Sequence, residues 1–129
     1  MHKRFLKVAA LTGALSVALG AFAAHTLKNN ISADALAIFE TAVRYQFYHV
    51  FALLAVAVLY KEFPGKLLLW SGKLFITGII LFCGSLYLLT AIKASGLSGY
   101  NWIGAITPFG GLCFIAGWLC LFMGVTKFK

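Results

Sequence analysis

The chain has 129 residues, of which 62% are hydrophobic and 11% are charged, and its mean hydropathy is +0.94. A soluble domain of this length keeps too much surface to hide so many apolar side chains, which excludes an ordinary water-soluble fold. The net charge of +8 does not indicate nucleic-acid binding, because the Lys and Arg residues lie mostly at the ends of apolar runs and form no basic stripe. We expect a single transmembrane domain over residues 1–129, surrounded by membrane lipid.

Four apolar runs are long enough to cross a bilayer as helices, which takes roughly 20 residues each. The predicted helices cover about residues 5–27, 33–61, 67–92 and 108–126. Only helices suit these runs, because backbone polar groups in lipid must be satisfied within their own segment. The sequence therefore predicts an all-α integral membrane protein, a bundle of four transmembrane helices.

The first predicted helix has the appearance of a signal peptide. A basic N-terminus precedes it, and Ala21-Phe22-Ala23 resembles a cleavage site with small residues. We expect the segment to be retained as a helix of the bundle, because Ser16, Gly20 and Ala24 place small residues at regular helical spacing.

Turn and cap residues mark the connections. Ser32 is suited to cap the second helix, and Asp34 suits its positive first turn. Phe63-Pro64-Gly65 predicts the turn into the third helix. Thr107 followed by Pro108 fits an N-cap and a first helical position for the fourth helix.

The distribution of cations predicts the orientation in the membrane. The side of the N-terminus carries eight of them, at Lys3, Arg4, Lys7, Lys61, Lys66, Lys73, Lys127 and Lys129. The opposite side carries three, at Lys28, Arg44 and Lys93. Both termini are therefore expected to be cytoplasmic.

Small residues recur along three of the helices. Besides Gly20 on the first helix, the third has Thr77, Gly84 and Ala91, and the fourth has Gly110, Gly117 and Gly124. Because lipid supplies no hydrophobic drive between helices, close backbone approach at such residues favours association. Spacing of seven residues predicts left-handed packing of the bundle.

Few residues carry the chemistry of an enzyme. Only three acidic residues exist, and no paired carboxylates, P-loop or zinc motif is visible. Cys83, Cys113 and Cys120 lie in apolar runs outside any CxxC pair, which favours packing over metal or redox use. The sequence thus favours a protein without enzymatic activity and leaves an enzyme as the alternative.

Polar side chains are expected at one depth, in the half of the bundle away from the termini. His49 shares a helix face with Ala42, Tyr45 and Ala52, so it is expected to point inward. It is either a functional group or a neutral core histidine with one hydrogen bond. The candidate cluster comprises His25, Arg44, Tyr45, His49, Ser85, Tyr87 and Thr107. For the tyrosines, an interfacial aromatic belt is the alternative.

His25 and His49 together raise the alternative of a bis-histidine haem. Their expected depths in the membrane are unequal, and no other feature of the sequence points to haem. We therefore expect no cofactor and no metal ion.

Four motifs together resemble a known family. They are GAFAAH at 20–25, RYQFYH at 44–49, FCGSLY at 82–87, and TPFGG at 107–111 with Gly117-Trp118. The chain resembles domain-of-unknown-function family four-two-three, although it has Ala23 where glycine is usual and Cys83 where serine is usual. The resemblance implies a small four-helix protein of the bacterial inner membrane, with mitochondrial-type eukaryotic relatives. It implies no established activity.

Three functions remain open at this point. The protein binds or moves a small or amphipathic molecule in the outer half of the bundle, or it is a structural or accessory subunit, or it is an enzyme acting on a lipid or quinone. Transport requires a polar path to both faces, and an accessory role predicts small-residue ladders that face outward. Such a subunit would join a homo-oligomer or a larger membrane complex.

Overall fold

The computed structural model describes residues 1–127 and contains only helices and connecting turns within them. Short π-helical or 3-10 segments join several of the helices into continuous rods. The rods are, in chain order, α1 (Lys3–Phe22) with η1 (Ala23–Leu27) and α2 (Lys28–Asn30); α3 (Ala33–Leu59); α4 (Lys66–Gly78) with η2 (Ile79–Cys83) and α5 (Gly84–Ala94); and η3 (Asn101–Ala105) with α6 (Thr107–Thr126).

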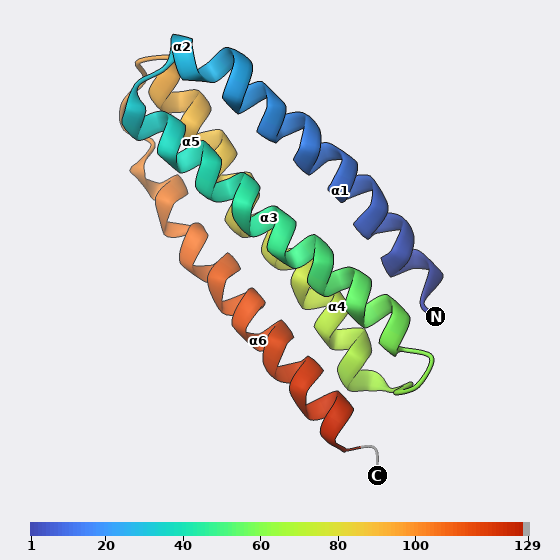
Figure 1. The fold of residues 1–129 in the computed structure, drawn as a ribbon. Helices are drawn as coiled ribbons and strands as arrows, with labels where there is room; N and C mark the ends of the chain where they lie inside the picture. Colours follow the sequence, from blue (N-terminus) through green and yellow to red (C-terminus); the bar gives the residue numbers. More distant parts are fainter. Residues whose placement is uncertain (128–129) are drawn as a thin grey trace.

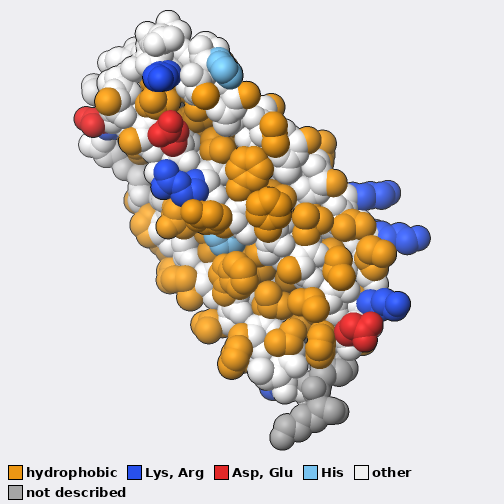
Figure 2. Space-filling view, in the orientation of Figure 1, with side chains coloured by type: hydrophobic (Ala, Val, Ile, Leu, Met, Phe, Trp, Pro, Cys, Tyr) orange, Lys and Arg blue, Asp and Glu red, His pale blue; other side chains and the backbone are white. Residues whose placement is uncertain are grey.

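All four rods are long and apolar enough to cross a membrane, with 26 to 29 residues each. At a rise of about 1.5 Å per residue, a rod of this length exceeds the roughly 30 Å hydrocarbon core of a bilayer. Figure 2 shows hydrophobic side chains across the middle of one face and charged side chains toward its ends. The prediction of four long apolar helices is confirmed.

Successive rods run in opposite directions, so the start of α1 and the end of α6 lie at the same end of the bundle (Figure 1). Rods that are consecutive in sequence pack together: α1 on α3, α3 on the rod formed by α4, η2 and α5, and that rod on α6. In Figure 1, α1 and α6 lie on opposite sides of α3. Each of these packings thus involves α3 or the rod of α4, η2 and α5, and α1 and α6 flank this central pair.

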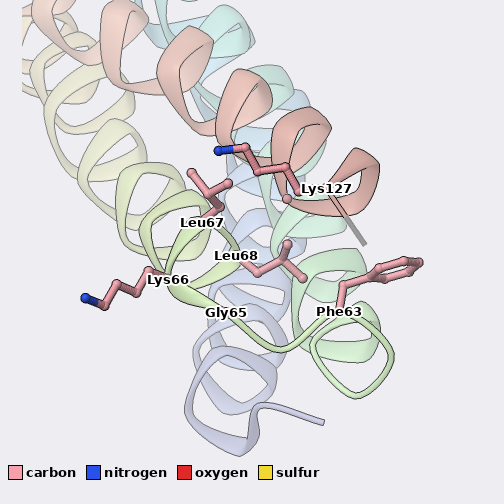
Figure 3. Close-up of a pocket in the computed structure, with 7 residues that line it drawn as sticks. Phe63, Gly65, Lys66, Leu67, Leu68 and Lys127 are labelled. Atoms are coloured by element: carbon pink, nitrogen blue, oxygen red, sulfur yellow. The ribbon is translucent and has the colours of Figure 1, made fainter. Parts of the chain in front are cut away.

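The connections follow the predicted signals in two of three places. The Ser32 hydroxyl accepts a hydrogen bond from the Ala35 N–H at 3.2 Å, which confirms it as the cap of α3. The turn around Phe63–Gly65 leads into α4 and lies beside the end of α6 (Figure 3). Thr107 is not an N-cap, because η3 leads into α6 and the carbonyl of Ile106 already accepts from the amide of Gly110.

A seam of glycines joins α6 to the preceding rod. Three residues of that rod, seven apart, face three glycines of α6 with the same spacing. The side chains of Leu68 and Phe75 lie over Gly124 and Gly117, and the backbone and Cβ of Phe82 lie over Gly110. A Cβ atom added at Gly117 would lie 2.7 Å from the Phe75 ring. The Ser71 hydroxyl also donates to the Gly117 carbonyl at 2.8 Å. These contacts let the two backbones approach closely.

The other small-residue ladders point in different directions. On α1, Ser16 is buried, and a Cβ added at Gly20 would lie 3.6 Å from Val43 of α3, an ordinary contact. A Cβ added at Gly84 would meet no atom within 4 Å, and this residue, like Thr77 and Ala91, is exposed. The ladder of the third rod therefore faces away from the other helices.

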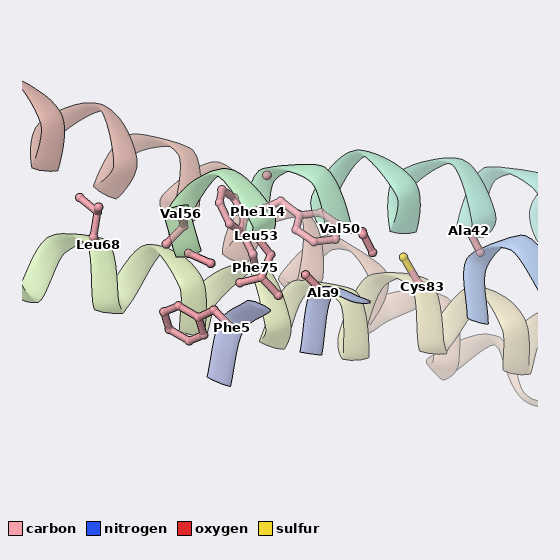
Figure 4. Packing of buried hydrophobic residues seen from close by; sticks show 12 residues of the cluster. Phe5, Ala9, Ala42, Val50, Leu53, Val56, Leu68, Phe75, Cys83 and Phe114 are labelled. Carbon is pink, nitrogen blue, oxygen red and sulfur yellow. The ribbon is translucent and has the colours of Figure 1, made fainter. Parts of the chain in front are cut away.

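The apolar core runs along the length of the bundle (Figure 4). Leu53, Val56 and Phe75 have no exposed surface, and Phe5 of α1 packs against Gly72. His2 fixes the start of α1: its Nδ1 accepts from the Phe5 amide at 3.3 Å, and its own amide donates to the Ala57 carbonyl.

Candidate functional site

The site is built around His49 on α3, which is 4% exposed. The residue lies about 24 Å along the helix from Ala33 and about 15 Å from Leu59, at about 1.5 Å rise per residue. His49 is therefore deep in the bundle, somewhat closer to the end with the termini than the sequence analysis expects. Tyr45, one turn earlier on the same face, is 37% exposed.

The hydrogen bonds of His49 define its tautomer. Nδ1 lies 2.7 Å from the carbonyl oxygen of Tyr45, and since a carbonyl can only accept, Nδ1 carries the proton. The indole Nε1–H of Trp118 on α6 points at His49 Nε2 at 3.2 Å. Indole can only donate, so Nε2 is the acceptor and the ring is neutral. The histidine thus links α3 to α6 through one hydrogen bond.

Aromatic rings surround this pair. His49 stacks on Phe114 of α6, with ring centroids 3.5 Å apart and planes inclined by 7°. Phe75 meets Trp118 edge to face at 5.2 Å, and Tyr45 lies 4.7 Å from Phe82. These stacked and edge-on contacts add specific geometry to the apolar packing.

An open groove of about 400 Å³ lies beside the pair, on the surface between α3 and α6. Its lining is Tyr45, His49, Phe82, Gly111, Phe114, Ile115 and Trp118. Gly111 has no side chain, and an added Cβ would come no closer than 3.9 Å to Phe82, so space remains there. The volume falls in the range of small-molecule sites, roughly 300–1,000 Å³.

A second polar network lies on another side of α3, with Gln46 at its centre. The Gln46 amide nitrogen donates to the Thr12 carbonyl of α1 at 3.2 Å. Its amide oxygen accepts from the Tyr87 hydroxyl of α5 at 2.7 Å. Gln46 is 2% exposed and lines neither of the two grooves of the bundle that we describe. The network therefore connects α1, α3 and α5, and both hydrogen bonds of the Gln46 side chain are made within the protein.

The predicted cluster residues fall into separate groups. Tyr45 and His49 line the groove, and Tyr87 belongs to the Gln46 network. Ser85 and Thr107 pair with each other, oxygen to oxygen at 2.6 Å. The last two, His25 on η1 and Arg44 on α3, are exposed. The seven residues do not converge on one centre.

Sequence reasoning missed two residues that organise the polar groups: Trp118, the partner of His49 at the groove, and Gln46, the centre of the second network. The signals were present: Gln46 is a polar amide within an apolar run, and Trp118 lies within a helix and not at a membrane edge. Within residues 1–127, no group of three His, Cys, Asp or Glu side chains is placed to hold a metal ion. The site therefore offers hydrogen-bond donors and acceptors.

Comparison with known proteins places the chain in a family. The family model described as protein of unknown function (DUF423) matches residues 19–111. A UPF0382 membrane protein of Haemophilus influenzae is 43% identical over 129 residues, covering 100% of this chain and 98% of the relative. One from Staphylococcus saprophyticus is 42% identical over 125 residues, covering 97% and 98%.

The UPF0382 inner membrane protein YgdD of Escherichia coli is 35% identical over 130 residues, covering 100% of this chain and 95% of the relative. No solved structure matches the chain. The family resemblance noted from the four motifs is confirmed, and the chain belongs to the DUF423 family of membrane proteins.

Proposed function

We propose that the protein binds, within the membrane, a lipophilic molecule that carries a hydroxyl group, in the groove between α3 and α6. The observation that carries this proposal is the pairing of His49 Nε2 with Trp118 Nε1–H at the groove. An acceptor and a donor lie together there among aromatic rings. The ligand site is thus near mid-depth, instead of in the outer half that the sequence suggested.

The hydrogen-bonding capacity of this pair selects the chemistry of the ligand. A hydroxyl both accepts and donates, so it can accept from Trp118 and donate to His49. One bond of 3.2 Å is then replaced by two. A ligand that only accepts would satisfy Trp118 and leave His49 Nε2 unpaired in apolar surroundings, which costs free energy. Alcohols and phenols are therefore preferred to ketones, esters and ethers.

The walls of the groove select the rest of the ligand. Tyr45, Phe82 and Phe114 offer aromatic surfaces, and Ile115 offers an aliphatic one. Trp118 is 46% exposed, so its ring has room to move away from His49. Because the groove opens at the side of the bundle, a molecule dissolved in the lipid reaches it laterally. A ring alcohol or phenol with an alkyl tail fits these surfaces.

Binding is supported better than catalysis or transport. Among the lining residues only Tyr45 and His49 can ionise, and both nitrogens of His49 are already paired. The groove thus offers no acid–base pair for an enzyme acting on a lipid or quinone. Within residues 1–127, the hydrogen-bonded polar side chains described above form separate groups and not a continuous path, which disfavours transport.

The test compares two probes, 4-decylphenol and 4-decylanisole, in which a methyl group of the second replaces the hydroxyl hydrogen of the first. Thermal unfolding of the purified protein in detergent is followed as each probe is titrated. We expect the phenol to bind roughly three- to tenfold more tightly, the worth of about one neutral hydrogen bond. His49→Leu should remove this preference, and Phe109→Leu, an exposed change outside the groove, should keep it. Equal binding of both probes by the unmodified protein would refute the proposal.

A role as a subunit of a membrane assembly is the second candidate, and one observation favours it. Thr77, Gly84 and Ala91 form an outward-facing ladder of small residues, the arrangement expected of such a subunit. Gly84→Leu should leave the unfolding temperature of the monomer unchanged and weaken cross-linking to partners or other copies in membranes. Unchanged cross-linking would count against this role.

We also infer that the protein lies in the bacterial inner membrane with both termini in the cytoplasm and left-handed packing. The eight-to-three distribution of cations supports the orientation, although Lys129 lies outside the described residues. The seven-residue spacing of the glycine seam supports left-handed packing of the helices. Reporter fusions after Lys66 should report cytoplasm, and fusions near Ser98 the opposite side; a cytoplasmic Ser98 would overturn the orientation.

A further inference from the structure

A second groove lies at the end of the bundle that holds the termini, between the start of α4 and the end of α6 (Figure 3). It encloses about 140 Å³ and is lined by Phe63, Gly65, Lys66, Leu67, Leu68, Gly124 and Lys127. None of these residues lines the groove beside His49. The two grooves are thus separate sites.

Two glycines, Gly65 and Gly124, are among the residues that line the groove. Gly124 closes the glycine seam, and a Cβ added there would overlap the side chain of Leu68. Gly65 precedes α4 and gives that helix no side-chain cap. Leu67 and Leu68 form an apolar wall beside the gap (Figure 3). Apolar surface therefore lies directly next to the positive end of a long helix.

Two cations from different rods border this apolar wall, Lys66 at the start of α4 and Lys127 just after α6. Both are exposed. The same end of the bundle also carries Lys3, Arg4, Lys7 and Lys61, against one acidic residue, Glu62. An excess of positive charge at a membrane surface attracts anionic lipid.

We propose that this groove binds one anionic phospholipid. Its phosphate lies between Lys66 and Lys127, and the first part of one acyl chain lies against Leu67 and Leu68. Charge and apolar surface meet here, as they do at the phosphate–acyl junction of a lipid. A basic pocket between membrane helices is suited to an anionic headgroup. A zwitterionic lipid would place its own cation among these lysines, which disfavours it.

The test measures the affinity of the full-length protein in detergent for phosphatidylglycerol, phosphatidylcholine and inorganic phosphate, from the shift in thermal unfolding. Lys66→Gln/Lys127→Gln is compared with Lys7→Gln/Lys61→Gln, which removes the same charge from the same end but outside the groove. All four lysines are exposed, so both variants should fold. We expect phosphatidylglycerol to bind most tightly and the groove variant to lose roughly tenfold or more in affinity.

Three results would overturn the proposal. The first two are that phosphatidylcholine, or inorganic phosphate, binds as tightly as phosphatidylglycerol. The third is that the two double variants lose equal affinity for phosphatidylglycerol. The last result would mean that the charge of the whole end, and not the groove, attracts the lipid. His49→Leu should leave phosphatidylglycerol binding unchanged, so this site and the hydroxyl-ligand site stand or fall separately.

Discussion

Gln46 and His49 lie three residues apart on α3, and both are almost fully buried, at 2% and 4% exposure. Each takes part in two hydrogen bonds. Gln46 bonds to two other rods, through Thr12 and Tyr87. His49 uses one bond within its own helix and one to Trp118, which is 46% exposed at the edge of a groove.

The difference shows that burial alone does not tell a structural polar group from a binding one. Both partners of Gln46 belong to other helices and no described groove borders it, so nothing is placed to substitute for them. The outer partner of His49 is replaceable, because a ligand hydroxyl can enter between the two nitrogens. We therefore expect Gln46 to contribute to stability and His49 to contribute to binding.

The largest effect on stability is expected from Gln46→Leu. This change removes two interhelical hydrogen bonds and leaves the Tyr87 hydroxyl without its acceptor. Leaving a buried polar group unpaired costs about 1–3 kcal/mol. Unfolding in detergent should report a loss of that size in the free energy of unfolding.

A double-mutant cycle separates the hydrogen bond from the loss of packing. Gln46→Leu combined with Tyr87→Phe removes both partners, so the double variant should lose less than the sum of the two single losses. Additive losses would mean that Gln46 does not stabilise the bundle through Tyr87.

His49→Leu is expected to have a smaller effect on stability, about 1 kcal/mol or less, because its one interhelical bond reaches a half-exposed indole. It should abolish the preference for 4-decylphenol over 4-decylanisole, since the remaining Trp118 N–H donates equally well to either oxygen. Thermal unfolding with and without the probes measures both effects. A loss of stability exceeding that of Gln46→Leu would invert the comparison between the two residues.

Much of the fold could be predicted from the sequence, because lipid forces each long apolar run into a helix. The Ser32 cap and the turn at Phe63–Gly65 also follow from local chemistry. Which face of each helix packs against its neighbours could not be predicted as surely. The ladder of Gly110, Gly117 and Gly124 has the same spacing as that of Thr77, Gly84 and Ala91, yet the first is buried and the second exposed.

The reason is that a helix surrounded by lipid is apolar on its inner and outer faces, so its pattern of hydrophobicity gives little information about direction. The same limit applies to the site. The inward direction of His49 followed from its small neighbours on the helix, Ala42 and Ala52, which are buried. The pairing of His49 with Trp118 could not be predicted, because it depends on how α3 and α6 are staggered.

The smallest effect is expected from Trp118→Phe, which removes the indole N–H and keeps an aromatic ring. Stability should fall by less than in Gln46→Leu, because one interhelical hydrogen bond is lost instead of two and the unpaired His49 Nε2 borders the groove. In this variant His49 Nε2 has no donor until a ligand supplies one. A phenol then makes one hydrogen bond and the matched anisole makes none, whereas in the unmodified protein they make two and one. The preference for 4-decylphenol should therefore survive in Trp118→Phe and disappear in His49→Leu, although both variants break the same hydrogen bond. Titration of the unfolding temperature with each probe distinguishes the two variants. If both lose the preference, the bond between His49 and Trp118 positions the helices and does not select a hydroxyl, and His49 then belongs with Gln46 among the structural groups.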